Sequence, residues 1–289
     1  MPLPRAPVAL AAAPHAPPTR PLDRFDLYEI CVQSPERDAR VCRALHGGRP
    51  TILRDDFAGP GAVARAWAAL APSHRAVAVD RDPRPLRACD AASRVRAIVT
   101  DVRRTRARAD VIAALNYAVC EFHARTELLA YLRAARRSLR PGGILVADLY
   151  GGQVGVRPGA WTRAHHGPAG ERIRYTWEQR SIDELSGLVR NAIHFNVQPD
   201  RRPRVGARGA RQMRDAFVYD WRLWSIPELR EAMLEADFVR TDIHLRAAGA
   251  IDEHGDPHCA RVRSAADLGR AWSVFVVGRT SACRAIGSP

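Results

Sequence analysis

Residues 51–70 read TILRDDFAGPGAVARAWAAL, and this stretch decides the fold. A short apolar run, Thr51 to Leu53, leads into a turn that contains Gly59 and Gly61. The Ala-rich segment from Ala62 to Leu70 then favours a helix. A strand, a glycine turn and a helix in this order are typical of the first unit of an open α/β sheet that binds a ligand at the turn.

The same alternation continues along the chain. Further strands are predicted over 76–79, 95–100, 110–115 and 144–149, and helices over 83–92 and 124–139. Connections of this length predict a parallel sheet that is doubly wound, with helices on both faces. A helix capped by Ser225 and two late strands, 238–245 and 272–277, complete a Rossmann-like α/β sheet of seven strands.

The region after the fifth strand has another character. Aromatic and β-branched residues fill the segments 173–181, 188–197 and 216–222, which predict an antiparallel β insertion over 151–224. We expect this α/β domain to run over 51–289 and the segment 23–50 to form a helical cap of one or two short helices.

Residues 1–22, rich in Pro and Ala, are expected to be a disordered leader. An organellar transit peptide is the competing interpretation, because no acidic residue precedes Asp23. No apolar run approaches the roughly 20 residues that a bilayer-spanning helix needs, so we expect no membrane association.

The formal net charge of +14 is carried by arginine alone, since the chain contains no lysine. Arginines are spread along every segment, which points to a general compositional bias. The one local concentration is 201–214, with six arginines and no acidic residue. A solvated loop is the preferred interpretation of that segment, and a contact with phosphates is the alternative.

The six cysteines are scattered without a paired spacing, which favours a reducing, cytoplasmic location. His254, His258 and Cys259, with Asp252, Glu253 and Asp256 nearby, fit no familiar zinc spacing. We interpret that stretch as a polar loop and expect no metal. The pair His165-His166 is likewise interpreted as loop.

Polar residues follow four successive predicted strands, at 56–61, Asp80, Asp101 and Asn116. The carboxyl ends of parallel strands meet at one edge of the sheet, where open α/β folds bind their ligands. The two turn glycines and the helix start at Ala62 suit the carboxylate of a methionine moiety. Asp80 is spaced to accept ribose hydroxyls, and Asp101 to bond an adenine amino group. Each Asp alone is also a common helix cap.

A nicotinamide dinucleotide is the alternative ligand of such a turn. Its binding motif has three glycines, G-x-G-x-x-G, whereas Ala64 stands here in the third position. Alanine is sometimes accepted there, so this alternative is weakened and stays open.

Several motifs extend the pattern into a specific resemblance. They are LRDDFAG at 53–59, DRDP at 80–83, ALNY at 114–117, PGG at 141–143, DLYGG at 148–152, YTWEQ at 175–179 and YDWRLW at 219–224, with LYE at 27–29 and VQ at 32–33. Over roughly 23–279 the chain resembles class I S-adenosylmethionine (SAM)-dependent methyltransferases, within a group of largely undefined substrate that has Asp-Phe-x-Gly in its first motif. Phe57 stands where most class I enzymes have glycine, and Ala58 replaces a frequent cysteine.

The resemblance implies that SAM is the cofactor and that the strand ends bind it. The residues so implied are Asp55, Phe57, Ala58, Gly59, Gly61, Asp80, Arg81, Asp101, Val102 and Asn116. The methyl acceptor would lie beneath the N-terminal segment and the insertion, against Tyr28, Tyr150, Trp177, Tyr219, Trp221 and Trp224. Core packing is the other interpretation of Trp221 and Trp224.

Methyl transfer is an in-line displacement, so the chemistry requires positioning first and a base only for a protonated acceptor. Tyr117 is expected beside the transferred methyl group, and Glu121 and His123 are candidate bases, although a helix cap and a surface histidine are the ordinary roles of those two. A small-molecule acceptor is the preferred hypothesis. Methylation of RNA or another polyanion, and a non-catalytic SAM-binding interaction subunit, are the alternatives. The oligomeric state stays open.

Overall fold

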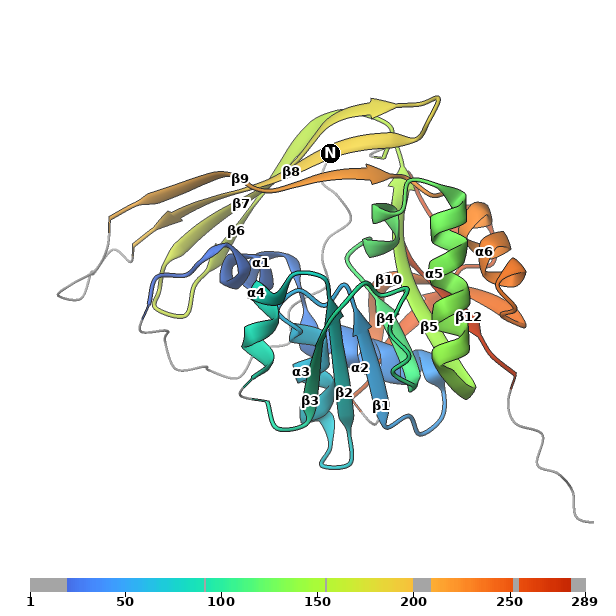
Figure 1. Cartoon of the computed structure of the whole chain (residues 1–289). Helices are drawn as coiled ribbons and strands as arrows, with labels where there is room; N and C mark the ends of the chain where they lie inside the picture. Colours follow the sequence, from blue (N-terminus) through green and yellow to red (C-terminus); the bar gives the residue numbers. More distant parts are fainter. Residues whose placement is uncertain (1–19, 91, 154, 200–208, 252–254, 282–289) are drawn as a thin grey trace, which may run out of the picture.

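The first core unit follows the glycine turn as predicted, with β1 (Ile52–Asp56) leading through the turn into α3 (Ala62–Leu70). The structure is a computed structural model, and it describes residues 20–90, 92–153, 155–199, 209–251 and 255–281. Within these residues, the chain forms a large mixed sheet and a smaller antiparallel sheet, which lies above the ends of the large sheet's strands (Figure 1).

The large sheet has the strand order β11-β10-β12-β5-β4-β1-β2-β3. Its strands are β1, β2 (Arg75–Asp80), β3 (Val95–Val99), β4 (Ala109–Ala114), β5 (Leu139–Gly152), β10 (Arg240–Ile251), β11 (Pro257–Arg261) and β12 (Ala271–Arg279). β1 pairs in parallel with both β2 and β4, while β12 runs antiparallel between β5 and β10. The strand order therefore reverses between β1 and β4, where such sheets open a crevice at the carboxyl ends.

Helices cover both faces of the large sheet (Figure 1). α2 (Pro35–His46) and α3 pack on one face, and α5 (Arg125–Ser138) and α6 (Ile226–Glu235) on the other. The fully buried Trp67 and Tyr131 belong to these two layers. Burial of large apolar side chains on both faces explains why the central strands read as nearly continuous apolar runs.

The small sheet has the order β6-β7-β8-β9 and is antiparallel throughout. Its strands are β6 (Gly159–His166), β7 (Arg172–Asp183), β8 (Leu188–Gln198) and β9 (Arg211–Arg222). α1 (Arg24–Val32) packs beneath it, and Leu27 and Cys31 join a core cluster with Ile173 and Phe195 (Figure 1).

Three expectations about local structure were wrong. His165-His166 ends strand β6 and is no loop, because alternate residues of that segment face the two sides of the sheet. His258 and Cys259 lie in β11, which adds an eighth strand to the seven expected. The helix predicted over 83–92 is a single turn, α4 (Pro83–Leu86), followed by the 3-10 turn η1 (Arg87–Cys89). Pro85 disfavours helical backbone at the preceding Arg84, which works against a longer helix here.

Other expectations fall partly outside the described residues. Residues 1–19 of the expected leader lie outside, whereas Leu22 is buried with the α1 cluster. Asp252, Glu253 and His254 lie outside, as do the first four arginines of the 201–214 segment. Asp256 is buried and pairs with Arg43 at 2.6 Å.

The Rossmann-like fold with an antiparallel insertion after the fifth strand is confirmed. Among the helices of the described ranges, none is long and apolar enough to cross a membrane.

Candidate functional site

The glycine turn after β1 holds three residues in the left-handed region, Phe57 (φ 58°), Gly59 (φ 53°) and Gly61 (φ 66°). A Cβ on Gly61 would collide with the sulfur of Cys89, so close packing alone excludes a side chain there. A Cβ on Gly59 would meet nothing within 4 Å. The backbone at Gly59 is therefore open to a ligand, while Gly61 fixes the turn against β2.

Phe57 stands in a conformation that most residues avoid. Its ring makes edge-on contacts with Phe122 and Tyr131, each at a centroid distance of 5.7 Å. These ring contacts offset the backbone strain of Phe57, a strain that glycine at this position would not have.

Two carboxylates border the turn. Asp80 accepts the Gly59 N–H at 2.7 Å and the Asp82 N–H at 2.9 Å, one on each oxygen. Asp55 accepts the Ala64 N–H at 3.3 Å and has no cationic partner among the described residues. Burial, and then the neighbouring Asp56 and Asp80, raise the pKa of Asp55 well above its usual value. A cationic group bound beside the turn would offset the cost of burying the Asp55 carboxylate in its charged form.

The next predicted residues lie further along the same edge. Asp101 forms a fork with Arg103, whose Nη2 lies 2.6 Å from the carboxylate, and this hydrogen bond lowers the pKa of Asp101. Val102 is buried in the main core. The Arg81 side chain is 82% exposed and reaches toward Glu121 at 3.4 Å. Arg81 is thus less constrained than the other residues of the edge.

A strained turn follows β4. Asn116 (φ 60°) and Tyr117 (φ 64°) are consecutive left-handed residues, and the carboxylate of Asp148 accepts both of their N–H groups, at 3.1 and 2.6 Å. Arg246 Nη1 lies 2.6 Å from Asp148 Oδ2, the oxygen that also accepts the Asn116 N–H, and its Nη2 donates to the Asn116 side chain at 3.2 Å. These buried contacts hold the strand end that faces the glycine turn.

Arg246 also connects this turn to the N-terminal helices. It lies 3.3 Å from Asp38 on α2, and Asp38 lies 3.4 Å from Arg37. Burial opposes the charge of Arg246, yet Asp148 and Asp38 raise its pKa above the usual value. Sequence reasoning missed this network because its members are far apart along the chain and no local motif marks Arg37, Asp38 or Arg246.

A cavity of about 330 Å³ opens between the two sheets, bounded by α1, the β4 turn and the inner face of the small sheet. The side chains that line it are Tyr28, Cys31, Val32, Ser34, Arg37, Asn116, Tyr117, Tyr150, Trp161, Arg163, Tyr175, Trp177, Ile193, Tyr219, Trp221, Leu245, Arg246, Asp267, Leu268, Ala271, Trp272 and Ser273. Its walls are mainly aromatic, and Asn116 and Tyr117 belong both to the cavity and to the strand-end edge.

The aromatic rings of the cavity form one connected group. Tyr117 lies 4.7 Å from Tyr150 and 6.2 Å from Trp221, and Trp221 lies 4.5 Å from Tyr219. Trp177 contacts the last two rings and Tyr150. The Tyr117 hydroxyl lies 3.2 Å from Ser273 Oγ.

The structure brings together the six candidates Tyr28, Tyr117, Tyr150, Trp177, Tyr219 and Trp221, all of which line the cavity. Trp224 is buried elsewhere and donates to the Phe122 carbonyl. Glu121 accepts the Trp221 indole N–H at 2.9 Å, and the exposed His123 lies 2.7 Å from the Asp220 carbonyl. Neither Glu121 nor His123 is among the cavity-lining residues.

The other lining residues were not predicted, among them Arg37, Trp161, Arg163, Arg246 and Trp272. The alternation in 159–166 offers a signal for Trp161 and Arg163, since it places both on one face of a strand. No comparable signal marks Arg37 or Arg246.

Comparison with known proteins agrees with this geometry. Residues 57–147 match the family model described as a methyltransferase domain. That span runs from the glycine turn into β5 and contains most of the strand-end residues. A search of curated protein sequences finds no match to the chain.

Solved structures share the fold over nearly the whole chain. DesVI from Streptomyces venezuelae has a TM-score of 0.66 at 14% identity, covering 91% of this chain and 100% of its own. The SAM-bound amino pentose methyltransferase CalS10 from Micromonospora echinaspora has 0.62 at 17%, covering 92% and 100%. The sugar N-methyltransferase KedS8 from a Streptoalloteichus species has 0.60 at 16%, covering 94% and 99%.

The family match identifies a methyltransferase domain over residues 57–147, and the solved structures, one of them with SAM bound, share the fold of nearly the whole chain. These findings identify the protein as an S-adenosylmethionine-dependent methyltransferase.

Proposed function

We propose that the protein transfers a methyl group from SAM to a small molecule held in the aromatic cavity. One observation carries this proposal: Asn116 and Tyr117 line the cavity and also end β4, beside the point where the strand order reverses. A cofactor along the strand ends and an acceptor in the cavity would meet at these two residues.

Roles for the cofactor residues follow from their surroundings. The open backbone at Gly59 would admit the methionine moiety, and the buried carboxylate of Asp55 would bind its ammonium group. Each Asp80 oxygen already accepts one N–H and keeps a lone pair for a ribose hydroxyl. Ala58 is buried at the turn, and Asp101, Val102 and Arg81 would lie along the adenine side.

Bound SAM would supply an electrophilic sulfonium methyl group for in-line displacement. The chain's own contribution is then to orient the acceptor and to exclude water. Tyr117, fixed through its N–H to Asp148 and through its hydroxyl to Ser273, forms a rigid wall at the meeting point. Electron-rich rings around it would also favour the positive charge of the sulfonium.

The size and enclosure of the cavity support a small acceptor over a polyanion. A volume of about 330 Å³ suits a small ligand, and an aromatic lining is typical of such sites. CalS10 and KedS8, which share the fold, are named for methylation of an amino pentose and of a sugar nitrogen. Within this proposal the chain belongs to the group that has Asp-Phe-x-Gly in its first motif, and acts in a reducing, cytoplasmic setting where its buried cysteines stay free.

Two measurements test the proposal. Calorimetry with S-adenosylhomocysteine, the demethylated cofactor, should show binding to the wild type, a loss of at least tenfold in Asp80→Ala and no change in the exposed control Asp90→Ala. Incubation with methyl-labelled SAM and a metabolite extract should yield a labelled small molecule. No cofactor binding by folded protein would contradict the site. Label in RNA alone, declining steeply with salt, would favour the polyanion acceptor.

A further inference from the structure

Four charged side chains line the cavity: Arg37, Arg163, Arg246 and Asp267. Two of these arginines form ion pairs with carboxylates that do not line the cavity. Arg246 pairs with Asp148 and Asp38, and Arg37 pairs with Asp38. Two carboxylates thus balance two guanidinium groups beneath the cavity. The exposed Asp267 is occupied as a turn cap, because its Oδ2 accepts the N–H groups of Arg263 and Ser264 at 2.8 and 2.9 Å.

Arg163 is different. It lies on the inner face of β6, opposite Tyr175 in the strand register and two residues from Trp161, and it is partly buried. Its guanidinium makes no hydrogen bond or ion pair with any other residue in the described ranges. Its charge also contributes, after burial, to lowering the pKa of the nearby His165.

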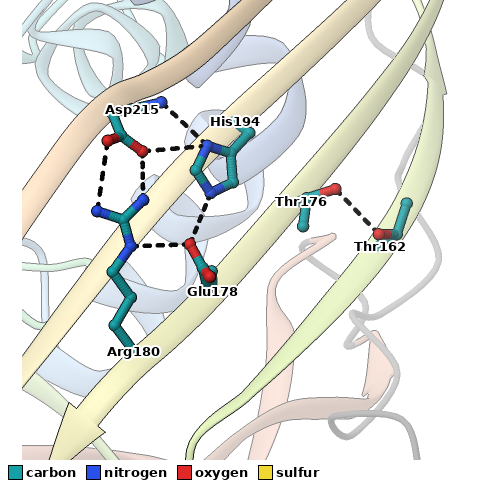
Figure 2. Close-up of polar contacts among 6 residues, drawn as sticks. All are labelled: Thr162, Thr176, Glu178, Arg180, His194 and Asp215. Atoms are coloured by element: carbon teal, nitrogen blue, oxygen red, sulfur yellow. Dashed lines mark hydrogen bonds and ion pairs between the residues drawn. The ribbon is translucent and has the colours of Figure 1, made fainter.

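An arginine on the opposite face of the same sheet, Arg180, is paired with acidic side chains (Figure 2). Arg180 lies 2.9 Å from Glu178 and also pairs with Asp215, and both acids contact His194. This outer-face arginine, partly buried like Arg163, is thus supplied with two carboxylates. The cavity-facing Arg163 has none, although a charge in an enclosed, apolar site is felt more strongly than one in water.

We propose that Arg163 binds an anionic group of the methyl acceptor, a carboxylate or a phosphate attached to a flat ring. This inference rests on the proposed function, because it assigns the acceptor class of the same cavity. A guanidinium fork matches either group in geometry, and the rings of Trp161 and Tyr175 beside it would hold a flat body. The nearly buried Arg37 leaves its Nε without a hydrogen-bond partner in the described part of the chain, which adds a donor on the α2 side of the cavity.

The same charges argue against a cationic amine as the acceptor. None of the cavity-lining residues is a carboxylate free to receive an ammonium group, since Asp267 is exposed and occupied as a cap. An ammonium would also add to the positive charge of Arg163. The acceptor of this protein therefore differs in charge from a simple amine, whatever the amino-sugar enzymes of the same fold bind.

The test compares four probes with one ring: benzoate, phenyl phosphate, benzamide and benzylamine. Each is titrated by calorimetry into the full chain saturated with S-adenosylhomocysteine. We expect benzoate or phenyl phosphate to bind at least tenfold more tightly than benzamide, and benzylamine most weakly. The order of benzoate and phenyl phosphate distinguishes a carboxylate from a phosphate.

Arg163→Gln should remove the preference for the anions, and Arg163→Lys should retain part of it. Arg174→Gln, an exposed arginine on the outer face of neighbouring β7, is the matched control and should leave all four affinities unchanged. Anion affinity unchanged in Arg163→Gln, tightest binding of benzylamine, or no detectable binding of either anion would overturn the inference. Cofactor-product affinity, measured first in every variant, separates these outcomes from a failure of the cofactor site itself.

Discussion

Arg246 lies 2.6 Å from the carboxylate of Asp148, directly beneath the left-handed turn at Asn116 and Tyr117. Replacing the arginine by methionine would leave Asp148 and Asp38 buried without their shared cation. We expect Arg246→Met to cost about 3–5 kcal/mol of unfolding free energy, the usual penalty for breaking a buried pair from one side.

The loss should be larger at pH 8 than at pH 5. Burial raises the pKa of Asp148 and Arg246 opposes this rise, so without the arginine the folded state holds a proton on Asp148 that the unfolded chain releases, and stability falls as pH rises. Urea unfolding at both pH values checks this. Arg240→Met, an exposed position on the same strand, is the control. A variant as stable as the wild type would show that the network does not hold the turn.

Asp55 provides a prediction about pH in the cofactor-free protein. Because burial raises the pKa of Asp55 well above its ordinary value, the folded state binds a proton that the unfolded state has already released. The contribution of Asp55 to stability should therefore decline from about pH 4 upward until the raised pKa is passed. Asp55→Asn should flatten this decline in thermal melts and weaken binding of S-adenosylhomocysteine. An equal pH slope in the variant and the wild type would refute this account; Asp90→Asn serves as the control.

Phe57→Gly tests whether packing outweighs strain at the first position of the turn. Glycine would relieve about 1–2 kcal/mol of left-handed strain, but the lost ring contacts with Phe122 and Tyr131 should cost about 3–5 kcal/mol. We expect a net loss of about 2 kcal/mol in urea unfolding, with cofactor-product binding largely kept. Equal or higher stability of the variant would mean that the ring contacts contribute little.

Glu121 should act through Trp221 and not on the acceptor. Glu121→Gln keeps an oxygen for the indole N–H, so we expect methyl transfer to the metabolite extract within about threefold of the wild type. Glu121→Ala leaves the indole without its partner and should cost about 1–3 kcal/mol of stability. If the glutamine variant binds the cofactor product normally yet loses transfer, Glu121 takes a proton from the acceptor instead.

The sequence predicted the architecture because strand, turn and helix carry local signals. The helix at Ala62–Leu70 matches its predicted bounds, and Asp80 ends its strand as expected. β6 and β11 were missed because their polar and histidine-containing segments look like loops until a neighbouring strand pairs with them.

The candidate site was predictable only on its aromatic side. Tyr150, Trp177 and Trp221 belong to quoted motifs, and they line the cavity. The charged side was not predictable, because an arginine in a chain of 45 basic residues, all arginine, carries no information by itself. Whether Arg163 or Arg246 has a partner depends on contacts between distant segments, which only the folded chain brings together.

The packing of α1 against the small sheet has a consequence for protein engineering. Leu22, Leu27 and Cys31 share one apolar cluster with the inner face of β7, β8 and β9. An exchange of acceptor specificity between enzymes of this fold must therefore transplant residues 22–32 together with 159–222. A graft of the strands alone would expose their apolar face and leave the acceptor without one of its walls.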